Sequence, residues 1–251
     1  MIPAFLEPFK SDIEKHQLDT IKIKATPVAN GEKLPITQSK FLGLPYLPAG
    51  MDYPKGKDGK PLIMLAQINF AAVPALENYP TKGILQLFVH PTKWDEMKDY
   101  KILFHEEVAD HFQTDFSFLK PDLYEDSPIE CEHKLEFKKE IEYGSVCDFR
   151  FNIDFGGKNY DDFQETLPQA EMEALENLFY ITGHKIGGYA SFTQDDPRSA
   201  NNRSKDDVLL LQIDSDHKIM FGDSGIANVF INIDDLKNKR FDKAYFHWDC
   251  C

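Results

Sequence analysis

Two parts of this chain carry the same short sequences in the same order, and this internal repeat restricts its fold more than any other feature. Gly83 opens the sequence GILQLFV, and Gly225 opens the related sequence GIANVFI, 142 residues further along the chain. Phe104-His105 and Phe246-His247 follow at the same separation. Apolar, strand-like sequences that recur at a fixed separation are typical of a duplicated structural unit.

Two further matches lie upstream of the first pair. The sequence LAQIN ends at Asn69 and LLQID ends at Asp214, 145 residues apart. In addition, KFLGLP parallels HKIGGY, and Gly43 matches Gly187 at a separation of 144 residues. Four matches in one order indicate two β-rich copies that pack against each other, because one copy alone would bury its apolar face poorly.

The repeat predicts one globular domain over residues 1–251, with copies at approximately 36–107 and 184–249. Between them, residues 133–155 alternate apolar and polar side chains on both sides of the sequence EYGS, which predicts a β-hairpin. Residues 168–181 have a helical period and begin with proline, which predicts a helix. The expected fold is mainly β and roll-like, with duplicated halves and a few helices, and an α+β arrangement is the minor alternative.

The composition excludes several classes of partner. Apolar residues make up 42% of the chain and aromatic residues 13%, which is typical of a globular protein. The formal net charge of −14 repels phosphate backbones, so we expect no nucleic-acid partner. No apolar run is long enough to span a membrane, and the N-terminal sequence lacks the features of a signal peptide, so we expect no membrane association and a cytoplasmic location. No C-x-x-C pair or phosphate-binding glycine pattern is present, so no cofactor is predicted.

The sequence GHKIGGYASFTQDDPR, from Gly183 to Arg198, gathers the polar residues most typical of a site. One interpretation is a turn, in which an aspartate accepts a nearby backbone N–H and Pro197 fixes the bend. The other is a small polar binding pocket, whose candidate residues are His184, Gln194, Asp195, Asp196, Arg198 and Asp214. The pattern favours the turn for the glycines and leaves both interpretations open for the polar residues.

A metal site has little support in the sequence. The segment Asp214-Ser215-Asp216 is similar to half of a calcium loop, but Lys218 stands where the third oxygen ligand is needed. We therefore predict no metal, and retain Asp214, Asp216 and Asp223 only as weak candidates.

Seven segments together resemble the YwqG-like family, a bacterial family without an established function. In chain order they are SKFLGLPYLPAG, LAQINF, GILQLFV, GHKIGGYASFTQDDPR, LLLQIDSD, FGDSGIANVFI and FHWDC. The resemblance implies a mainly β, roll-like fold with duplicated halves, and it implies no established catalytic residues. One departure is Leu42, which takes the first place of a Gly-Gly pair that is usual in the family.

The leading functional prediction is a non-enzymatic binding protein for a partner protein or a small polar ligand, because no nucleophile–base pair is legible. An immunity-type acidic protein that covers a basic toxin surface is one form of this class. The alternative is an enzyme with a polar site between the halves. In that case His184 is the general base, Asp195 or Asp196 orients it, and Arg198 holds an anionic group.

Overall fold

The computed structural model describes residues 2–29, 32–200 and 205–251 and confirms the mainly β fold. The strands are β1 (Leu18–Pro27), β2 (Lys40–Phe41), β3 (Ile63–Asn69), β4 (Ile84–Val89), β5 (Tyr100–His105), β6 (His133–Glu142), β7 (Lys185–Gly187), β8 (Asp207–Ile213), β9 (Ile226–Asn232) and β10 (Tyr245–Asp249). The α-helices are α1 (Lys10–Lys15), α2 (Tyr160–Gln164), α3 (Gln169–Phe179), α4 (Pro197–Ala200) and α5 (Ile233–Lys237). Short 3-10 helices are η1 (Ala4–Phe9), η2 (Phe70–Ala72), η3 (Trp94–Glu96), η4 (Pro121–Tyr124) and η5 (Phe241–Lys243).

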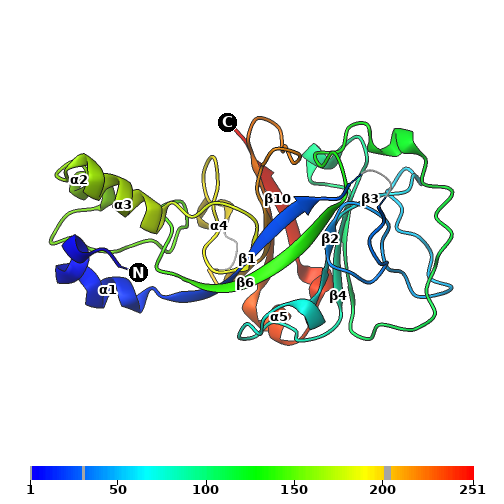
Figure 1. The fold of residues 1–251 in the computed structure, drawn as a ribbon, viewed down its shortest axis with the longest axis horizontal. Coiled ribbons are helices and arrows are strands. Elements are labelled where there is room, and N and C mark those ends of the chain that lie inside the picture. Colours follow the sequence, from blue (N-terminus) through cyan, green and yellow to red (C-terminus); the bar gives the residue numbers. More distant parts are fainter. Residues whose placement is uncertain (1, 30–31, 201–204) are drawn as a thin grey trace.

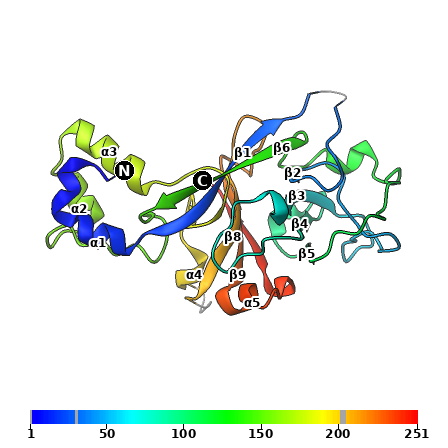
Figure 2. The ribbon, with the colours of Figure 1, turned by 60° about the horizontal axis from the view of Figure 1, so that its bottom comes forward.

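All ten strands join one antiparallel sheet in the order β10-β9-β8-β7-β1-β6-β2-β3-β4-β5. The sheet curls into a nearly closed barrel, with β8 and β9 on one side of the β1–β6 pair and β2–β5 on the other (Figure 2). Its two edge strands approach each other through side chains, since the rings of Tyr100 on β5 and Phe246 on β10 lie 5.9 Å apart.

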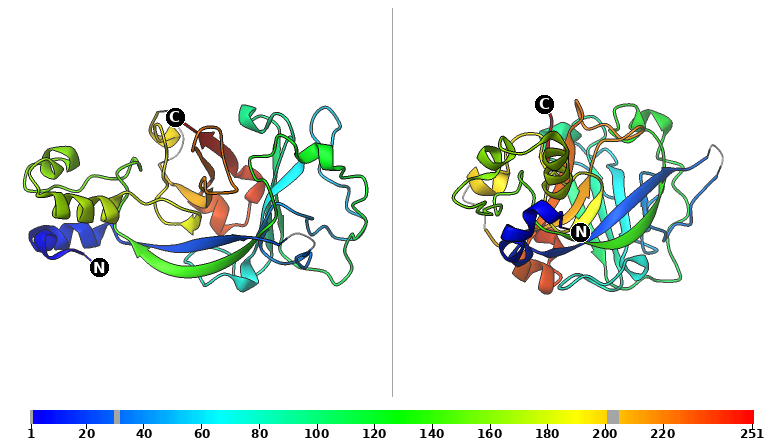
Figure 3. Two further views of the ribbon diagram at one scale, coloured as in Figure 1. Left: turned by 45° about the horizontal axis from the view of Figure 1, so that its top comes forward. Right: turned by 60° about the vertical axis from the view of Figure 1, so that its left-hand side comes forward.

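The helices α1, α2 and α3 lie together at one end of the molecule, beyond the ends of β1 and β6 (Figure 1). We call this part the cap, defined as residues 2–16 and 151–180. The long β1–β6 pair runs from the cap into the barrel (Figure 3). The cap has its own hydrophobic core, which contains Leu6, Ile13, Ile153, Phe155, Tyr160, Leu175 and Phe179. The main core lies in the barrel and draws residues from both halves.

The strand order is symmetric about the β1–β6 pair, and this symmetry supports the proposed duplication. In each half the third strand has a register shift at the same place, between Met64 and Ala66 in β3 and between Leu209 and Leu211 in β8. The ten strands form two sets of five in chain order, β1–β5 and β6–β10, and the first strands, β1 and β6, pair with each other and with the second strand of the opposite set. These pairs connect both sets in one sheet.

A pair of buried lysines occupies equivalent places in the two halves. Lys40 pairs with Gln67 in the β2–β3 register, and Lys185 pairs with Gln212 in the β7–β8 register. Both lysine ammonium groups lie beside a carboxylate, 3.2 Å from Glu132 and 3.1 Å from Glu142 respectively. Burial lowers the pKa of both lysines, and the nearby carboxylates oppose that shift.

The Phe-His match between the halves is not a structural equivalence. In the first half Ile84, one residue after Gly83, pairs with His105, whereas in the second half Ile226, one residue after Gly225, pairs with Asp249. His105, the partner of Ile84, is therefore equivalent to Asp249, the partner of Ile226, and not to His247. The two Phe-His pairs are displaced by two residues along their strands, so the expectation that they coincide is wrong.

The glycine match also needs correction by one residue. Gly43 stands three residues after Lys40 and Gly188 three residues after Lys185, so Gly43 corresponds to Gly188, and Leu42 corresponds to Gly187. A Cβ atom on either Gly43 or Gly188 would lie 2.3 Å from a glutamate oxygen. The close approach of a glutamate carboxylate explains why both positions are glycine.

The predicted hairpin over 133–155 is wrong. Residues 133–142 do form a strand, but it pairs with β1 and β2, and residues 147–155 form turns and irregular structure instead of its partner. Two aspartates in this segment hold turns through their own side chains, since Asp148 accepts from the N–H of Arg150 and Asp154 from that of Gly157. Such local hydrogen bonds compete with a strand ladder, although the apolar alternation is typical of a strand.

The region between the two predicted copies also contains the predicted helix, in a slightly shorter form. The helix α3 lies within the predicted range 168–181, and Pro168 precedes its first residue.

No helix among the described residues combines the length and the apolar content needed to cross a membrane.

Candidate functional site

The structure separates the predicted pocket residues into three groups with different environments. His184 and Asp214 lie together at the end of β8, and Asp196 and Arg198 form part of a buried ion-pair network. Gln194 and Asp195 are exposed on the loop between these groups. The single pocket lined by His184 and Arg198 is therefore not what the structure contains.

His184 holds the end of β8. Its Nδ1 accepts from the backbone N–H of Asp214 at 2.9 Å, and its Nε2 lies 3.2 Å from the carboxylate of Asp216. In the first half Ser39 has the equivalent role, because its Oγ accepts from the backbone N–H of Asn69 at 2.9 Å. A repeated hydrogen bond at the same place in both halves indicates a structural role.

The same contacts remove His184 as a general base. An Nδ1 that accepts a hydrogen bond is unprotonated, so the neutral ring carries its proton on Nε2 and donates it to Asp216. Burial lowers the pKa of His184, although Asp216 opposes the shift. Neither ring nitrogen has a lone pair free to take a proton from a substrate, which does not support the enzyme alternative.

Arg198 is fully buried and its hydrogen-bond donors are directed at protein acceptors. Its Nη2 lies 2.8 Å from the carboxylate of Asp148 and 2.6 Å from that of Asp196, and its Nε donates to Asp196 at 3.0 Å. Its Nη1 donates to the backbone oxygen of Asp207. The guanidinium also packs on the ring of Phe230, 4.7 Å from the centroid. An anion from solvent cannot reach this group, so the prediction that Arg198 holds an anion is wrong.

We expect Asp148 to contribute to acid unfolding. Burial raises the pKa of Asp148, but Arg150 and Arg198 outweigh that effect and lower it to about 2, below the usual value of 3.8. The unfolded chain therefore takes up the proton first as the pH falls, so this stabilisation is present above pH 3.8 and is lost on the way to about pH 2. Urea unfolding at stepped pH should show a shallower loss in this window for Asp148→Asn than for the parent, and equal slopes would contradict the assignment.

A buried carboxylate fixes the loop that carries the remaining candidates. Asp249, on β10, accepts through Oδ2 from the backbone N–H of Thr193 at 2.9 Å and of Gln194 at 2.7 Å. The side chain of Gln194 donates to the backbone oxygen of Cys250. Asp195 is exposed and its carboxylate has no partner among the described residues. Asp249 and the side chain of Gln194 thus connect this loop to β10 and the residue after it.

Two open cavities share this loop as a wall. The first, which we call the cap cavity, has a volume of about 530 Å³ and is lined by Phe151, Tyr160, Asp161 and Tyr180 together with residues 194–196. The second, which we call the C-terminal cavity, has a volume of about 460 Å³ and is lined by the same loop residues together with Asp95, Trp248 and Asp249. No lysine or arginine of the described chain lines either cavity.

Each cavity is lined by a residue that has a buried polar atom without a described protein partner. For the cap cavity this atom is the hydroxyl of Tyr160, a residue that is only 7% exposed. For the C-terminal cavity it is Oδ1 of Asp249, a residue that is 8% exposed. Both atoms have almost no solvent-accessible surface, so a ligand in either open cavity does not contact them in this structure.

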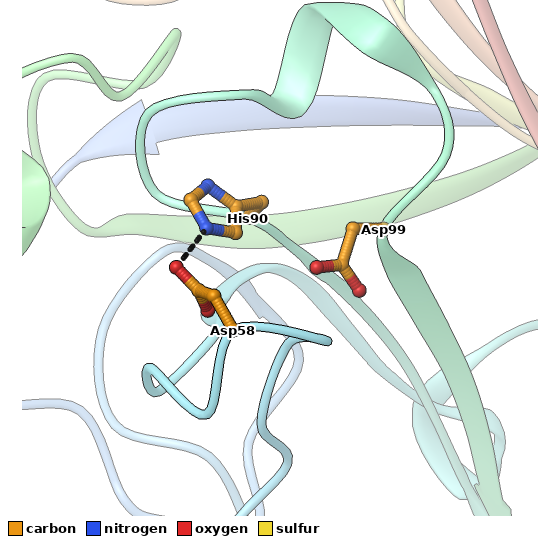
Figure 4. A group of neighbouring side chains, drawn as sticks. All are labelled: Asp58, His90 and Asp99. Carbon is orange, nitrogen blue, oxygen red and sulfur yellow. Dashed lines mark hydrogen bonds and ion pairs between the residues drawn. The ribbon is translucent and has the colours of Figure 1, made fainter.

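The weak metal candidates do not converge. Asp214 accepts from the backbone N–H groups of Gly183 and Ser215, Asp216 accepts from that of Lys218, and Asp223 lies exposed in the turn before β9. Within residues 2–29, 32–200 and 205–251, one group has the spacing for a metal, namely Asp58, His90 and Asp99, whose ligand atoms lie within 4.8 Å of one another (Figure 4).

The side-chain contacts of His90 argue against a metal at that group. Its Nδ1 accepts from the backbone N–H of Thr92, so the neutral ring carries its proton on Nε2, which faces Asp58 at 3.2 Å. A metal-binding histidine has the opposite arrangement, with a lone pair toward the metal and an N–H toward a second acceptor. Asp99 also accepts from the backbone N–H of Lys57. The three residues brace two loops against each other.

Sequence reasoning missed the residues that complete both cavities. Tyr160 and Tyr180 come from the cap, and Asp249 and Trp248 from the last strand, so each is distant in sequence from the loop at 194–196. No local pattern distinguishes these residues from ordinary core or surface positions.

Comparison with known proteins gives a family and no function. A family described as a domain of unknown function, DUF1963, matches residues 39–250. No curated protein matches the chain.

Proposed function

We propose that this chain, which belongs to the DUF1963 family of domains of unknown function, is a binding protein for a positively charged side chain of a partner protein. The proposal is argued from the residues of its own cavities, because the family description names no function. The cap cavity receives that side chain. The observation that carries the proposal is that the exposed carboxylates of Asp161 and Asp195 line one cavity together with the exposed ring of Tyr180, while no described lysine or arginine lines it.

The lining of the cap cavity suits an organic cation. Asp161 and Asp195 are exposed, and no hydrogen bond or ion pair within the described part of the chain engages their carboxylates. The ring of Tyr180, a residue that is 51% exposed, also lines the cavity, and aromatic rings attract ammonium and guanidinium groups. The net charge of −14 adds long-range attraction for a basic partner.

Catalysis in the cap cavity has less support. Cys147 is the residue in its lining with the greatest nucleophilic potential, but burial raises the pKa of this thiol. A thiol with a raised pKa is a poor nucleophile at neutral pH. Binding therefore accounts for the lining better than group transfer does.

Titration with N-acetylarginine amide, followed by NMR chemical shifts, tests the proposal. We expect saturable shifts at the cap cavity, and about tenfold weaker binding for Asp161→Asn or Asp195→Asn, because each variant removes one charge-assisted contact. The uncharged isostere N-acetylcitrulline amide should bind much more weakly than the arginine amide.

The matched control is Asp110→Asn, which removes one exposed carboxylate that has no described partner and does not line either cavity. It should leave binding unchanged. Equal binding of the arginine and citrulline amides, or an equal loss in Asp110→Asn, would show that no specific cation site exists here.

A further inference from the structure

A third cavity lies where the two halves of the sheet meet, and it shares no lining residue with the cap cavity. We call it the junction cavity. It has a volume of about 390 Å³, and its aliphatic walls come from β1, the loop between β3 and β4, β8 and α5, with Leu18, Leu76, Val208 and Ile233. Small-molecule sites commonly have volumes of about 300–1,000 Å³, apolar walls and a few polar groups, and they often lie between structural units.

Arg150 is the basic residue in the lining of the junction cavity, and its guanidinium is held in place. Nε and Nη2 donate to the two carboxylate oxygens of Asp148 at 2.8 and 2.7 Å, and Nη2 also donates to the backbone oxygen of Gly188. The guanidinium carbon lies 4.6 Å from the centre of the Tyr189 ring. These contacts fix the guanidinium before a ligand arrives, so little conformational entropy is lost on binding.

The remaining nitrogen of Arg150, Nη1, is free and accessible. It donates no hydrogen bond to any described residue. It is also not one of the described buried side-chain atoms that lack a partner, and the side chain of Arg150 is 26% exposed, so solvent reaches this nitrogen. Asp148 is shared with Arg198 and balances only part of the charge of Arg150. Nη1 therefore offers two charged N–H donors to an anionic group in the cavity.

The other charged residues of the lining oppose a ligand with a net negative charge. The carboxylate of Glu77 is exposed and has no partner among the described residues, and Asp19 lies 2.7 Å from Lys139. The net charge of −14 also repels anions at long range. A zwitterion avoids this repulsion, because it carries a carboxylate for Arg150 and an ammonium group for Glu77.

We infer that the junction cavity binds an α-amino acid with an aliphatic side chain. The ligand carboxylate accepts from Nη1 of Arg150, the ammonium group lies on the side of Glu77, and the aliphatic side chain packs against the apolar walls. This site is additional to the cap cavity and takes a different class of ligand, since the cap cavity has no basic residue in its described lining.

The first test is a titration with L-leucine, followed by NMR chemical shifts of the backbone amides. We expect saturable shifts at Leu18, Leu76, Val208 and Ile233, which line the junction cavity. Two analogues each lack one charged group: 4-methylpentanoate has no ammonium group, and 3-methylbutylamine has no carboxylate. Each should bind at least about tenfold more weakly than leucine, because each loses a charge-assisted contact. Equal binding of leucine and either analogue would contradict the assignment.

The second test uses variants of the two charged residues. Arg150→Lys should weaken leucine binding about tenfold, because lysine cannot contact Asp148 and present two donors to the ligand at once. The melting temperature is measured alongside, since Arg150 also contacts a buried carboxylate.

Glu77→Gln changes an exposed residue without a described partner, so its effect on binding does not depend on the stability of the fold. It should weaken leucine about threefold and strengthen 4-methylpentanoate, since one negative charge is lost from the lining. The matched control is Glu125→Gln, which is also exposed and lies outside the junction cavity. The same leucine affinity in both glutamine variants would show that Glu77 does not contact the ligand and that the zwitterion assignment is wrong.

The remaining outcomes separate this inference from its alternatives. If N-acetylleucine binds as tightly as leucine, the site takes the carboxylate end of a polypeptide and the assignment to a free amino acid is overturned. If leucine shifts no resonance of the junction cavity while N-acetylarginine amide binds in the cap cavity, this inference is wrong and the proposed function stands. If leucine binds and the amide does not, the proposed function is wrong and this inference stands.

Discussion

Replacing Arg198 with alanine is expected to lower the free energy of unfolding by about 3–5 kcal/mol. The change leaves two buried carboxylates, those of Asp148 and Asp196, without the guanidinium that they share. It also removes the packing of that guanidinium on Phe149 and Phe230. Urea unfolding followed by circular dichroism measures the loss.

The matched control is Arg240→Ala. Arg240 pairs with Asp235 at 2.6 Å, but its side chain is 50% exposed, and an exposed ion pair contributes about 1 kcal/mol or less. Arg198→Lys should fall between the two, because lysine restores the charge without the planar fork that contacts both carboxylates. A loss below about 1 kcal/mol for Arg198→Ala would mean that the network is not structural.

The order and type of most strands could be predicted because the signal is local. The sequences of β4 and β9 are apolar runs with a glycine before them, and both form strands that are buried on both faces. An apolar run of this kind forms a strand whichever strands it pairs with, because its burial and the turn residues beside it determine its secondary structure. The repeat could be predicted for the same reason, and the symmetric strand order supports it.

The pairing of the strands could not be predicted from local patterns. Residues 133–142 were expected to pair with the nearby residues 147–155, but they pair with β1, more than a hundred positions earlier in the chain. Alternation of apolar and polar residues identifies a strand and does not identify its partner. Local turns held by Asp148 and Asp154 decided the outcome, and their side-chain contacts are visible only in three dimensions.

The site was the least predictable part. Arg198, Asp196 and His184 have the residue types of a polar pocket, but a buried ion-pair network requires the same types. What distinguishes the two is the position of Asp148, which lies 50 residues before Arg198 in sequence and contacts it directly. No local sequence pattern marks Tyr160 and Asp249. Each has a buried polar atom without a described hydrogen-bond partner, and this property arises only in the folded chain.

The family match begins after a strand that the fold requires. The match covers residues 39–250, whereas β1 spans Leu18–Pro27 and lies in the middle of the sheet, between β6 and β7. All ten residues of β1 pair with β6, and Thr20, Ile21 and Lys22 also pair with β7. Ile21 is fully buried in the main core. The matched region alone therefore lacks the strand that joins its two halves.

Deleting residues 1–28 is expected to abolish cooperative unfolding, because the deletion leaves the inner edges of β6 and β7 unpaired and opens the barrel core. The control is a chain that begins at Gln17, which loses the cap residues Leu6 and Ile13 but retains β1. That chain should keep a cooperative transition, since the cap and the barrel have separate cores. Thermal unfolding followed by near-ultraviolet circular dichroism distinguishes the two. A synthetic peptide of residues 17–29, added to the chain that lacks residues 1–28, should restore the cooperative transition by strand addition. If the chain that lacks residues 1–28 unfolds cooperatively without the peptide, β1 is dispensable and the two halves of the sheet stay together without it.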